Sequence, residues 1–208
     1  FDKSLWAAHS PANPPILRSL FAAVIHEGFF YVLPGWDDHK KADILDIKRI
    51  NLNSQLTSWE DVTSEQLLVN KRSLIRDSYA SDIGNGVIYF ACGYDDKGGI
   101  SNDLVMFNLT DKELPIVSLT QSERVPSLRK NHSAFPIGSK IFIFGGENNQ
   151  GKLDDMWTFD LEIRSWTQVK FSGEAPTPRS GYASCLIGDR IYLYGGEGND
   201  QLYKDFYI

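Results

Sequence analysis

The 208-residue sequence has little cysteine, no long apolar run and no excess of basic charge. Two cysteines, Cys92 and Cys185, are too few for a disulfide framework, so we expect a reducing compartment: the cytoplasm, with the nucleus as the alternative. No apolar run approaches the roughly 20 residues of a membrane span, so no membrane insertion is expected. The 27 acidic and 21 basic side chains give a net charge of −6, which disfavours nucleic acid as a partner.

The sequence also lacks the short motifs of common catalytic and metal sites. It contains no Cys-x-x-Cys, His-Glu-x-x-His, Gly-x-Ser-x-Gly or Gly-Lys-Ser/Thr. The four histidines do not share a common spacing along the chain. We therefore expect no catalytic residue, no metal site and no cofactor in this region.

What the sequence does contain is an internal repeat of an arginine followed three positions later by an aromatic residue or a histidine. The four pairs are Arg18/Phe21, Arg76/Tyr79, Arg129/His132 and Arg179/Tyr182. A glycine-rich dipeptide begins thirteen residues after this aromatic residue or histidine in every copy. The four dipeptides are Pro34-Gly35, Cys92-Gly93, Gly145-Gly146 and Gly195-Gly196. This identical offset in four copies predicts four equivalent structural units.

Each copy is predicted to form four short strands, which we call A to D. Strand A follows the arginine, and strand B is the apolar tetrad before the glycine-rich pair, as in Ile141–Phe144. The unbroken apolar character of strand B indicates burial on both of its faces. Strand C follows an aspartate (Asp46, Asp103, Asp155 or Asp205), and strand D carries Trp59 or Trp166, with Leu114 in the second copy. Four-stranded sheets repeated radially make a β-propeller.

These residues resemble the Kelch family of β-propellers. The family signature consists of the Arg-x-x-aromatic or Arg-x-x-His motif, the glycine pair, the aspartate before strand C and the tryptophan of strand D. It is most complete from Arg129 to Trp166. The long B–C loops are more similar to Kelch proteins of the host-cell-factor and Rab-effector kind than to those of ubiquitin-ligase adaptors. The expected fold is all-β: a Kelch-type propeller of four-stranded blades, with about 3.5–4 blades of a six- or seven-bladed ring.

We interpret the chain as a single propeller segment. Residues 1–12 are expected to hold strand D of a preceding blade, because Trp6 precedes its arginine by nearly the same distance as Trp166 does. Three blades follow at residues 13–65, 66–122 and 123–172, and an incomplete blade occupies 173–208. Two alternatives stay open: further blades of the same chain complete the ring, or its two ends complete one blade of a four-bladed ring.

The resemblance implies binding of a protein partner on the loop face of the propeller, without catalysis. The alternative is a regulatory or substrate-recruiting domain of a larger enzyme, such as a phosphatase or a ubiquitin-ligase subunit. A third hypothesis, a metal-dependent catalytic propeller, has no motif in this sequence to support it.

The candidate partner-binding residues lie in the loops of that face. Arg76, Arg129 and Arg179 could contact acidic groups of a partner, or could instead hold their own blades together through loop carbonyls and the aspartate of strand C. The B–C loops differ between copies while the framework repeats, which is typical of recognition loops and also of ordinary solvated ones. Their candidate residues are Asp95, Asp96, Glu147, Asn148, Asn149, Glu197 and Asn199. Trp36 lies outside the repeat pattern, in a loop, and is a further candidate.

Overall fold

The computed structural model describes residues 8–19, 21–53, 58–63, 80–82, 86–94, 99–109, 117–118 and 124–208. Several residues singled out from the sequence lie outside these ranges: Trp6, Arg76, Tyr79, Asp95, Asp96 and Leu114. Within them the chain is all-β and contains no helix.

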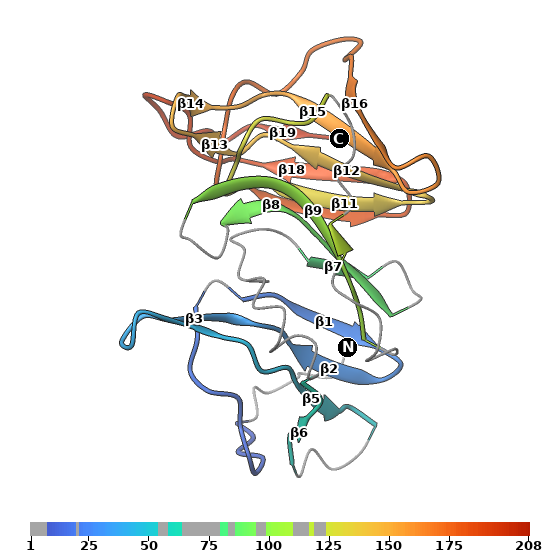
Figure 1. Cartoon of the computed structure of the whole chain (residues 1–208). Coiled ribbons are helices and arrows are strands. Elements are labelled where there is room, and N and C mark those ends of the chain that lie inside the picture. Colours follow the sequence, from blue (N-terminus) through green and yellow to red (C-terminus); the bar gives the residue numbers. More distant parts are fainter. Residues whose placement is uncertain are drawn as a thin grey trace, which may run out of the picture.

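Four antiparallel sheets, which we call blades, follow one another in sequence order (Figure 1). The first has the order β1 (Ala23–His26), β2 (Phe29–Val32), β5 (Lys48–Asn51), β6 (Glu60–Asp61). The second contains β7 (Ala80–Asp82), β8 (Val87–Tyr94), β9 (Ile100–Asn108) and β10 (Val117–Ser118). The third contains β11 (Ser133–Ile137), β12 (Lys140–Phe144), β15 (Met156–Asp160) and β16 (Ser165–Val169). The fourth contains β17 (Ala183–Ile187), β18 (Arg190–Tyr194) and β19 (Phe206–Tyr207).

Two further hairpins extend the B–C connections. The first blade carries β3 (Gly35–Asp37) paired with β4 (Ala42–Ile44), and the third carries β13 (Glu147–Asn148) paired with β14 (Gly151–Lys152). Both hairpins lie on the same side of the row of blades (Figure 1). The loops of this side therefore form one face of the molecule.

Strand B of the second blade is buried on both faces, as its continuous apolar character predicts, whereas Tyr194 in strand B of the fourth blade is 53% exposed. Along β8, Ile88 and Phe90 pack into a core shared with the first blade, whereas Tyr89 and Ala91 pack into a core shared with the third. Because side chains alternate between the two faces of a strand, one strand serves two inter-blade cores.

The first strands of successive blades lie close to one another. β7 contacts both β1 and β11, and the hydroxyl groups of Ser133 on β11 and Ser184 on β17 are 2.7 Å apart. Small side chains allow this approach, as expected for strands near a propeller axis.

The second glycine of the pair is required by a close backbone approach in the first, third and fourth copies. A Cβ added to Gly146, whose φ is +90°, would lie 2.6 Å from the carbonyl oxygen of Lys130. A Cβ added to Gly35 would lie 2.7 Å from the carbonyl oxygen of Ser19. The first copy keeps this close approach, but its pair has a different backbone conformation, because Gly35 does not have the positive φ of Gly93, Gly146 and Gly196.

In the third and fourth blades, the residue three positions after the arginine links its blade to the preceding one. His132 Nε2 lies 2.7 Å from the carbonyl oxygen of Ala91, and the Tyr182 hydroxyl donates to that of Phe144 at 2.5 Å. Burial, with the nearby charge of Arg129, lowers the pKa of His132 to about 3, so its ring is neutral and Nε2 donates. Burial raises the pKa of Tyr182 to about 12, which keeps its hydroxyl protonated.

A backbone hydrogen bond repeats beside this side-chain contact. The N–H of Gly93 donates to the carbonyl of Arg129 at 2.8 Å, and that of Gly146 donates to the carbonyl of Arg179 at 2.9 Å. In both cases the second glycine of one blade binds the arginine of the next blade. Adjacent blades are thus joined by polar contacts at fixed repeat positions as well as by apolar packing.

Candidate protein-interaction face

The three repeated arginines that the structure describes, Arg18, Arg129 and Arg179, lie beneath the loop face and are held by their own blades. The Arg129 guanidinium binds both carboxylate oxygens of Asp155, at 2.7 and 2.8 Å, and the carbonyl of Gly145 at 3.1 Å. Its remaining donors reach the carbonyl and the hydroxyl of Ser127, at 3.1 and 3.2 Å. These five bonds use all five N–H groups of the side chain.

Arg179 repeats this arrangement with Asp205, Gly195 and Thr177. Arg18 makes four such bonds, to Ile16, Leu33 and both a carboxylate oxygen and the carbonyl of Asp46. Arg129 and Arg179 are fully buried. In these three blades the aspartate before strand C is therefore the partner of the arginine.

The charge of the aspartate is retained in this buried setting. Burial would raise the pKa of Asp155, but the hydrogen bonds and charge of Arg129, with a bond from the Trp157 indole, hold that pKa below its ordinary value. The pair is thus an ionised, bidentate contact.

This geometry gives Arg129 and Arg179 a role within the blade. Each has its donors occupied and no exposed surface, so a partner could receive a bond from them only by displacing a structural acceptor. A direct partner contact by these residues stays a prediction, and the same holds for Arg76, which lies outside the described residues.

The residue after the glycine-rich pair occupies an equivalent place in three blades. Trp36, Glu147 and Glu197 each exchange two backbone hydrogen bonds with the residue that follows the arginine of the same blade, at 2.9–3.0 Å. Trp36 belongs to strand β3 and is half-buried, so the predicted loop at this position is a hairpin instead. One fixed backbone position therefore presents an indole in the first blade and carboxylates in the third and fourth.

Lys152 joins the B–C loops of the third and fourth blades. Its ammonium group donates to Glu147 in a very short contact, to the Ser180 hydroxyl at 2.9 Å and to Glu197 at 3.3 Å. Asn131 donates to the other carboxylate oxygen of Glu147 at 2.8 Å. Five residues from two blades therefore form one hydrogen-bonded network.

The network keeps both of its central groups charged. Burial would raise the pKa of Glu147, but bonds from Lys152 and Asn131 hold it below its ordinary value. Burial likewise opposes the charge on Lys152, yet the two carboxylates keep the pKa of Lys152 above its ordinary value. The loops are therefore fixed relative to each other before any ligand binds.

The other candidate residues surround this network. Asn148 caps the hairpin turn by accepting from the Gln150 N–H, Asn149 is exposed at the tip, and Asn199 accepts from the Lys152 N–H at 3.3 Å. The Glu197 side chain is 62% exposed. The structure thus brings Glu147, Asn148, Asn149, Glu197 and Asn199 to one face, where the sequence predicted them. Asp95 and Asp96 lie outside the described residues.

Sequence reasoning missed Lys152 and Asn131. A signal for Lys152 was present, because Glu147 and Lys152 are oppositely charged and flank a short turn, which favours a cross-strand pair in a hairpin. Asn131 carried no comparable signal, since its role depends on the approach of the D–A connection to the B–C loop.

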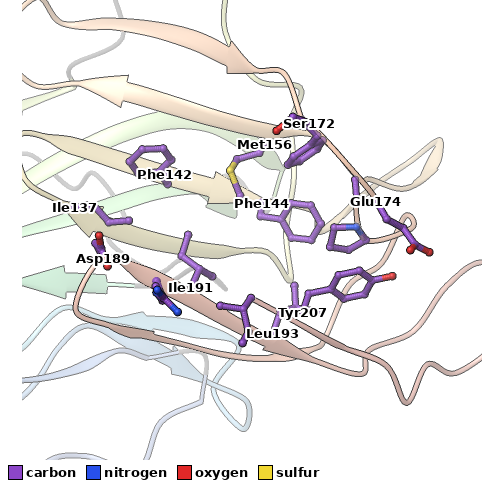
Figure 2. Close-up of a pocket in the computed structure, with 15 residues that line it drawn as sticks. Ile137, Phe142, Phe144, Met156, Ser172, Glu174, Asp189, Ile191, Leu193 and Tyr207 are labelled. Carbon is purple, nitrogen blue, oxygen red and sulfur yellow. The ribbon is translucent and has the colours of Figure 1, made fainter.

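An apolar cleft of about 740 Å³ lies between the third and fourth blades. Figure 2 shows Phe142, Phe144 and Met156 of the third blade on one side and Ile191, Leu193 and Tyr207 of the fourth on the other. The polar groups Glu174, Asp189 and Arg190 also line it. The cleft is a space between blade faces and is separate from the loop network.

The described part of the chain shows no group of three or more His, Cys, Asp or Glu side chains placed to hold a metal ion. Nor does it contain a helix long and apolar enough to cross a membrane. Cys92 is buried and Cys185 exposed, and the two are not joined by a disulfide.

The repeated sheets, with their buried arginines and inter-blade bonds, define a segment of a β-propeller. Residues 20–208 match the family model of the KLHDC2/KLHL20/DRC7 Kelch-repeats domain, so the chain belongs to the Kelch-repeat family. Kelch-repeat domains are generally non-catalytic modules that bind protein partners.

Relatives of known name match parts of the chain. Tip elongation aberrant protein 3 of Schizosaccharomyces pombe is 50% identical over 48 residues, which cover 23% of this chain and 4% of that protein. The leucine-zipper-like transcriptional regulator 1 homolog of Drosophila melanogaster is 32% identical over 91 residues, 40% of this chain and 9% of the relative. Rho GTPase-activating protein gacHH of Dictyostelium discoideum is 41% identical over 102 residues, 46% of this chain and 6% of the relative. The chain thus spans less than a tenth of the length of each.

Proposed function

We propose that this chain is a protein-interaction module that binds its partner on the face formed by the B–C loops of its blades. One observation carries the proposal: Trp36, Glu147 and Glu197 occupy one repeated backbone position but differ in chemistry. A rigid framework with variable side chains at one edge is the usual arrangement of a recognition surface.

The Lys152 network supports the same proposal. It fixes the loops of two blades in one arrangement, so a partner that binds there does not have to order them. Such preorganisation lowers the entropic cost of association. Glu197 and Asn149 remain exposed at the surface of this network and are the residues most able to reach a partner.

The test compares two matched double variants. A partner captured by the wild-type chain is purified, and its Kd is measured by calorimetry for Asn149→Ala/Glu197→Ala and for Glu162→Ala/Gln168→Ala. The second pair removes one acidic and one amide side chain from exposed positions in the C–D region of the third blade. We expect the first variant to bind about tenfold more weakly and the second to bind like the wild type. Equal affinity of all three proteins would refute the proposed face.

A second candidate is supported by the comparisons. The chain spans only 6% of a relative named as a Rho GTPase-activating protein, so a Kelch segment can form a small part of a much larger polypeptide. In that setting the same face would recruit or present a substrate. The Asn149→Ala/Glu197→Ala variant, placed in the full-length protein, would then lower turnover of the recruited substrate and leave turnover of a small generic substrate unchanged. A cytoplasmic setting is part of either proposal, because the sequence has only two cysteines.

A further inference from the structure

Thr177 is an exposed hydroxyl residue in the connection between the third and fourth blades. It lies between the end of β16 at Val169 and the start of β17 at Ala183. Pro178 follows it directly, and a residue before proline favours an extended conformation. Ser127, at the same repeat position between the second and third blades, is exposed as well. Exposure of a hydroxyl residue is therefore common to this position in two blades.

The Thr177 hydroxyl is bonded to the buried arginine of its blade. Its Oγ1 accepts from Arg179 Nη2 at 2.9 Å, and the same nitrogen donates to Asp205 Oδ2 at 2.9 Å. The hydrogen bonds and the charge of Arg179 hold the pKa of Asp205 below its ordinary value, so its carboxylate is ionised. The hydroxyl and an ionised carboxylate therefore share one guanidinium nitrogen.

The same hydroxyl also contacts the B–C loop of the fourth blade, through Tyr203. A hydrogen bond from Thr177 lowers the pKa of Tyr203, and the Arg179 guanidinium lies 4.2 Å from the centroid of the Tyr203 ring. A Cβ added to Gly198 would lie 2.6 Å from the Tyr203 hydroxyl oxygen, so this side chain packs against the loop. A change at Thr177 can therefore reach the loop that carries Glu197.

We propose that Thr177 is a phosphorylation site for proline-directed Ser/Thr kinases, and that its phosphate loosens the B–C loop of the fourth blade. The kinase transfers the γ-phosphoryl group of ATP to Thr177 Oγ1: the O–H bond breaks, a P–O bond forms, ADP leaves and the proton passes to the catalytic base of the kinase. Such kinases bind an extended segment and select a proline directly after the acceptor residue. Thr177 has that proline, whereas Ser127 is followed by Leu128.

The phosphate changes the charge around Arg179. Phosphothreonine carries a charge of about −1.5 to −2 near pH 7. A single guanidinium then faces both a phosphate and the Asp205 carboxylate, which repel each other and compete for the same Nη2 donor. The phosphate also replaces the hydroxyl that donates to Tyr203. We expect Asp205 and Tyr203 to lose these contacts, so that the main-chain hydrogen bonds of the B–C loop open more often.

Phosphate incorporation tests the site. The folded chain is incubated with ATP and a purified mitogen-activated protein kinase, and the phosphorylated residues are mapped by mass spectrometry. Ser10→Ala is present in every protein, because Ser10-Pro11 is the other Ser/Thr-Pro dipeptide of the sequence. We expect phosphate on Thr177, none on Ser127 and none in the Thr177→Val variant. No phosphate on Thr177, or phosphate that is added only to the urea-unfolded chain, would overturn the proposal.

Hydrogen exchange tests the effect on the loop, with an internal control in the third blade. Gly195 N–H donates to the Asp205 carbonyl at 3.1 Å, and Gly145 N–H donates to the Asp155 carbonyl at the same distance. We expect the Gly195 amide to exchange about tenfold faster in the phosphorylated chain and the Gly145 amide to be unchanged. Thr177→Val removes the hydroxyl without adding charge and should have a smaller effect.

Two results would overturn the proposed effect on the loop. One is a Gly195 exchange rate that phosphorylation does not change. The other is the same rate in Thr177→Val as in the phosphorylated chain, because loss of the hydroxyl alone would then account for the change. Neither measurement needs a binding partner, so the outcome does not depend on the proposed interaction face.

Discussion

Replacing Arg129 with alanine is the most direct way to test whether the repeated arginine is structural. The substitution removes five hydrogen bonds in which the donor is a fully buried guanidinium. It also leaves the Asp155 carboxylate without its counter-ion and the Gly145 carbonyl without a side-chain donor. Removing one partner of a buried ion pair is costly, because the remaining charge stays in a medium that solvates it poorly.

The expected loss in the free energy of unfolding is about 3–5 kcal/mol for Arg129→Ala. Arg129→Lys keeps the positive charge but has three donors and lacks the planar fork that binds both oxygens of Asp155, so we expect an intermediate loss of about 1–3 kcal/mol. A loss of this size is a large part of the about 5–15 kcal/mol that stabilises a typical domain.

Urea denaturation followed by circular dichroism measures these differences. Arg164→Ala is the matched control, because Arg164 is exposed in the third blade and its loss should change stability by about 0.5 kcal/mol at most. Blades can unfold separately, so hydrogen exchange of the β12 and β15 amides provides a local measurement. A loss below about 1 kcal/mol for Arg129→Ala would refute the structural role and restore the partner-binding one.

Three further outcomes follow from the described contacts. The pKa of His132 is about 3 in the folded state, against 6.5 for the free side chain, so below pH 6.5 the unfolded state binds a proton that the folded state does not. The free energy of unfolding should therefore fall by about 2 kcal/mol from pH 7 to pH 5. His132→Phe should flatten this pH dependence. Tyr182→Phe removes a donor to Phe144 and should lower stability by about 1–3 kcal/mol in urea denaturation; no change would contradict the inter-blade bond. Lys152→Met should raise the pKa of Glu147, measured by NMR titration, and an unchanged pKa would argue against the loop network.

The framework could be predicted from sequence because its determinants are periodic. The offset from each arginine to its glycine-rich pair fixes the lengths of strands A and B and of the turn between them, and the apolar tetrad fixes the burial of strand B. Those features predicted the four sheets and the burial of both faces of β8. The first copy differs at this pair: Pro34 stands at the first position and Gly35 lacks the positive φ of its equivalents, although Gly35 still closely approaches the residue after its arginine.

The role of the arginines could not be decided in the same way. A repeated Arg is compatible with a ligand site and with a structural bond, and the sequence alone left both open. The deciding atoms are mostly backbone oxygens, such as the carbonyls of Gly145 and Ser127 around Arg129. Backbone acceptors have no sequence pattern of their own, so only the folded geometry shows that every donor is occupied.

Trp36 shows a different limit. It was assigned to a loop outside the repeat, yet it follows Pro34 by two residues just as Glu147 follows Gly145. The sequence offset was sufficient to show this equivalence, but an indole and a carboxylate differ too much to suggest it. The backbone bridges of Trp36, Glu147 and Glu197 in the structure establish it.

That equivalence supports the proposed interaction face, because it shows one repeated position at which a strongly repetitive framework carries different side chains. Positions whose side chains complete the blade, such as Arg129 and Asp155, cannot vary without loss of buried hydrogen bonds. The position after the glycine pair contributes its backbone to the framework, while its side chain differs between blades: an indole in the first and a carboxylate in the third and fourth. Under the proposed function, specificity would reside at such positions, where the framework uses the main chain and the side chain differs between blades.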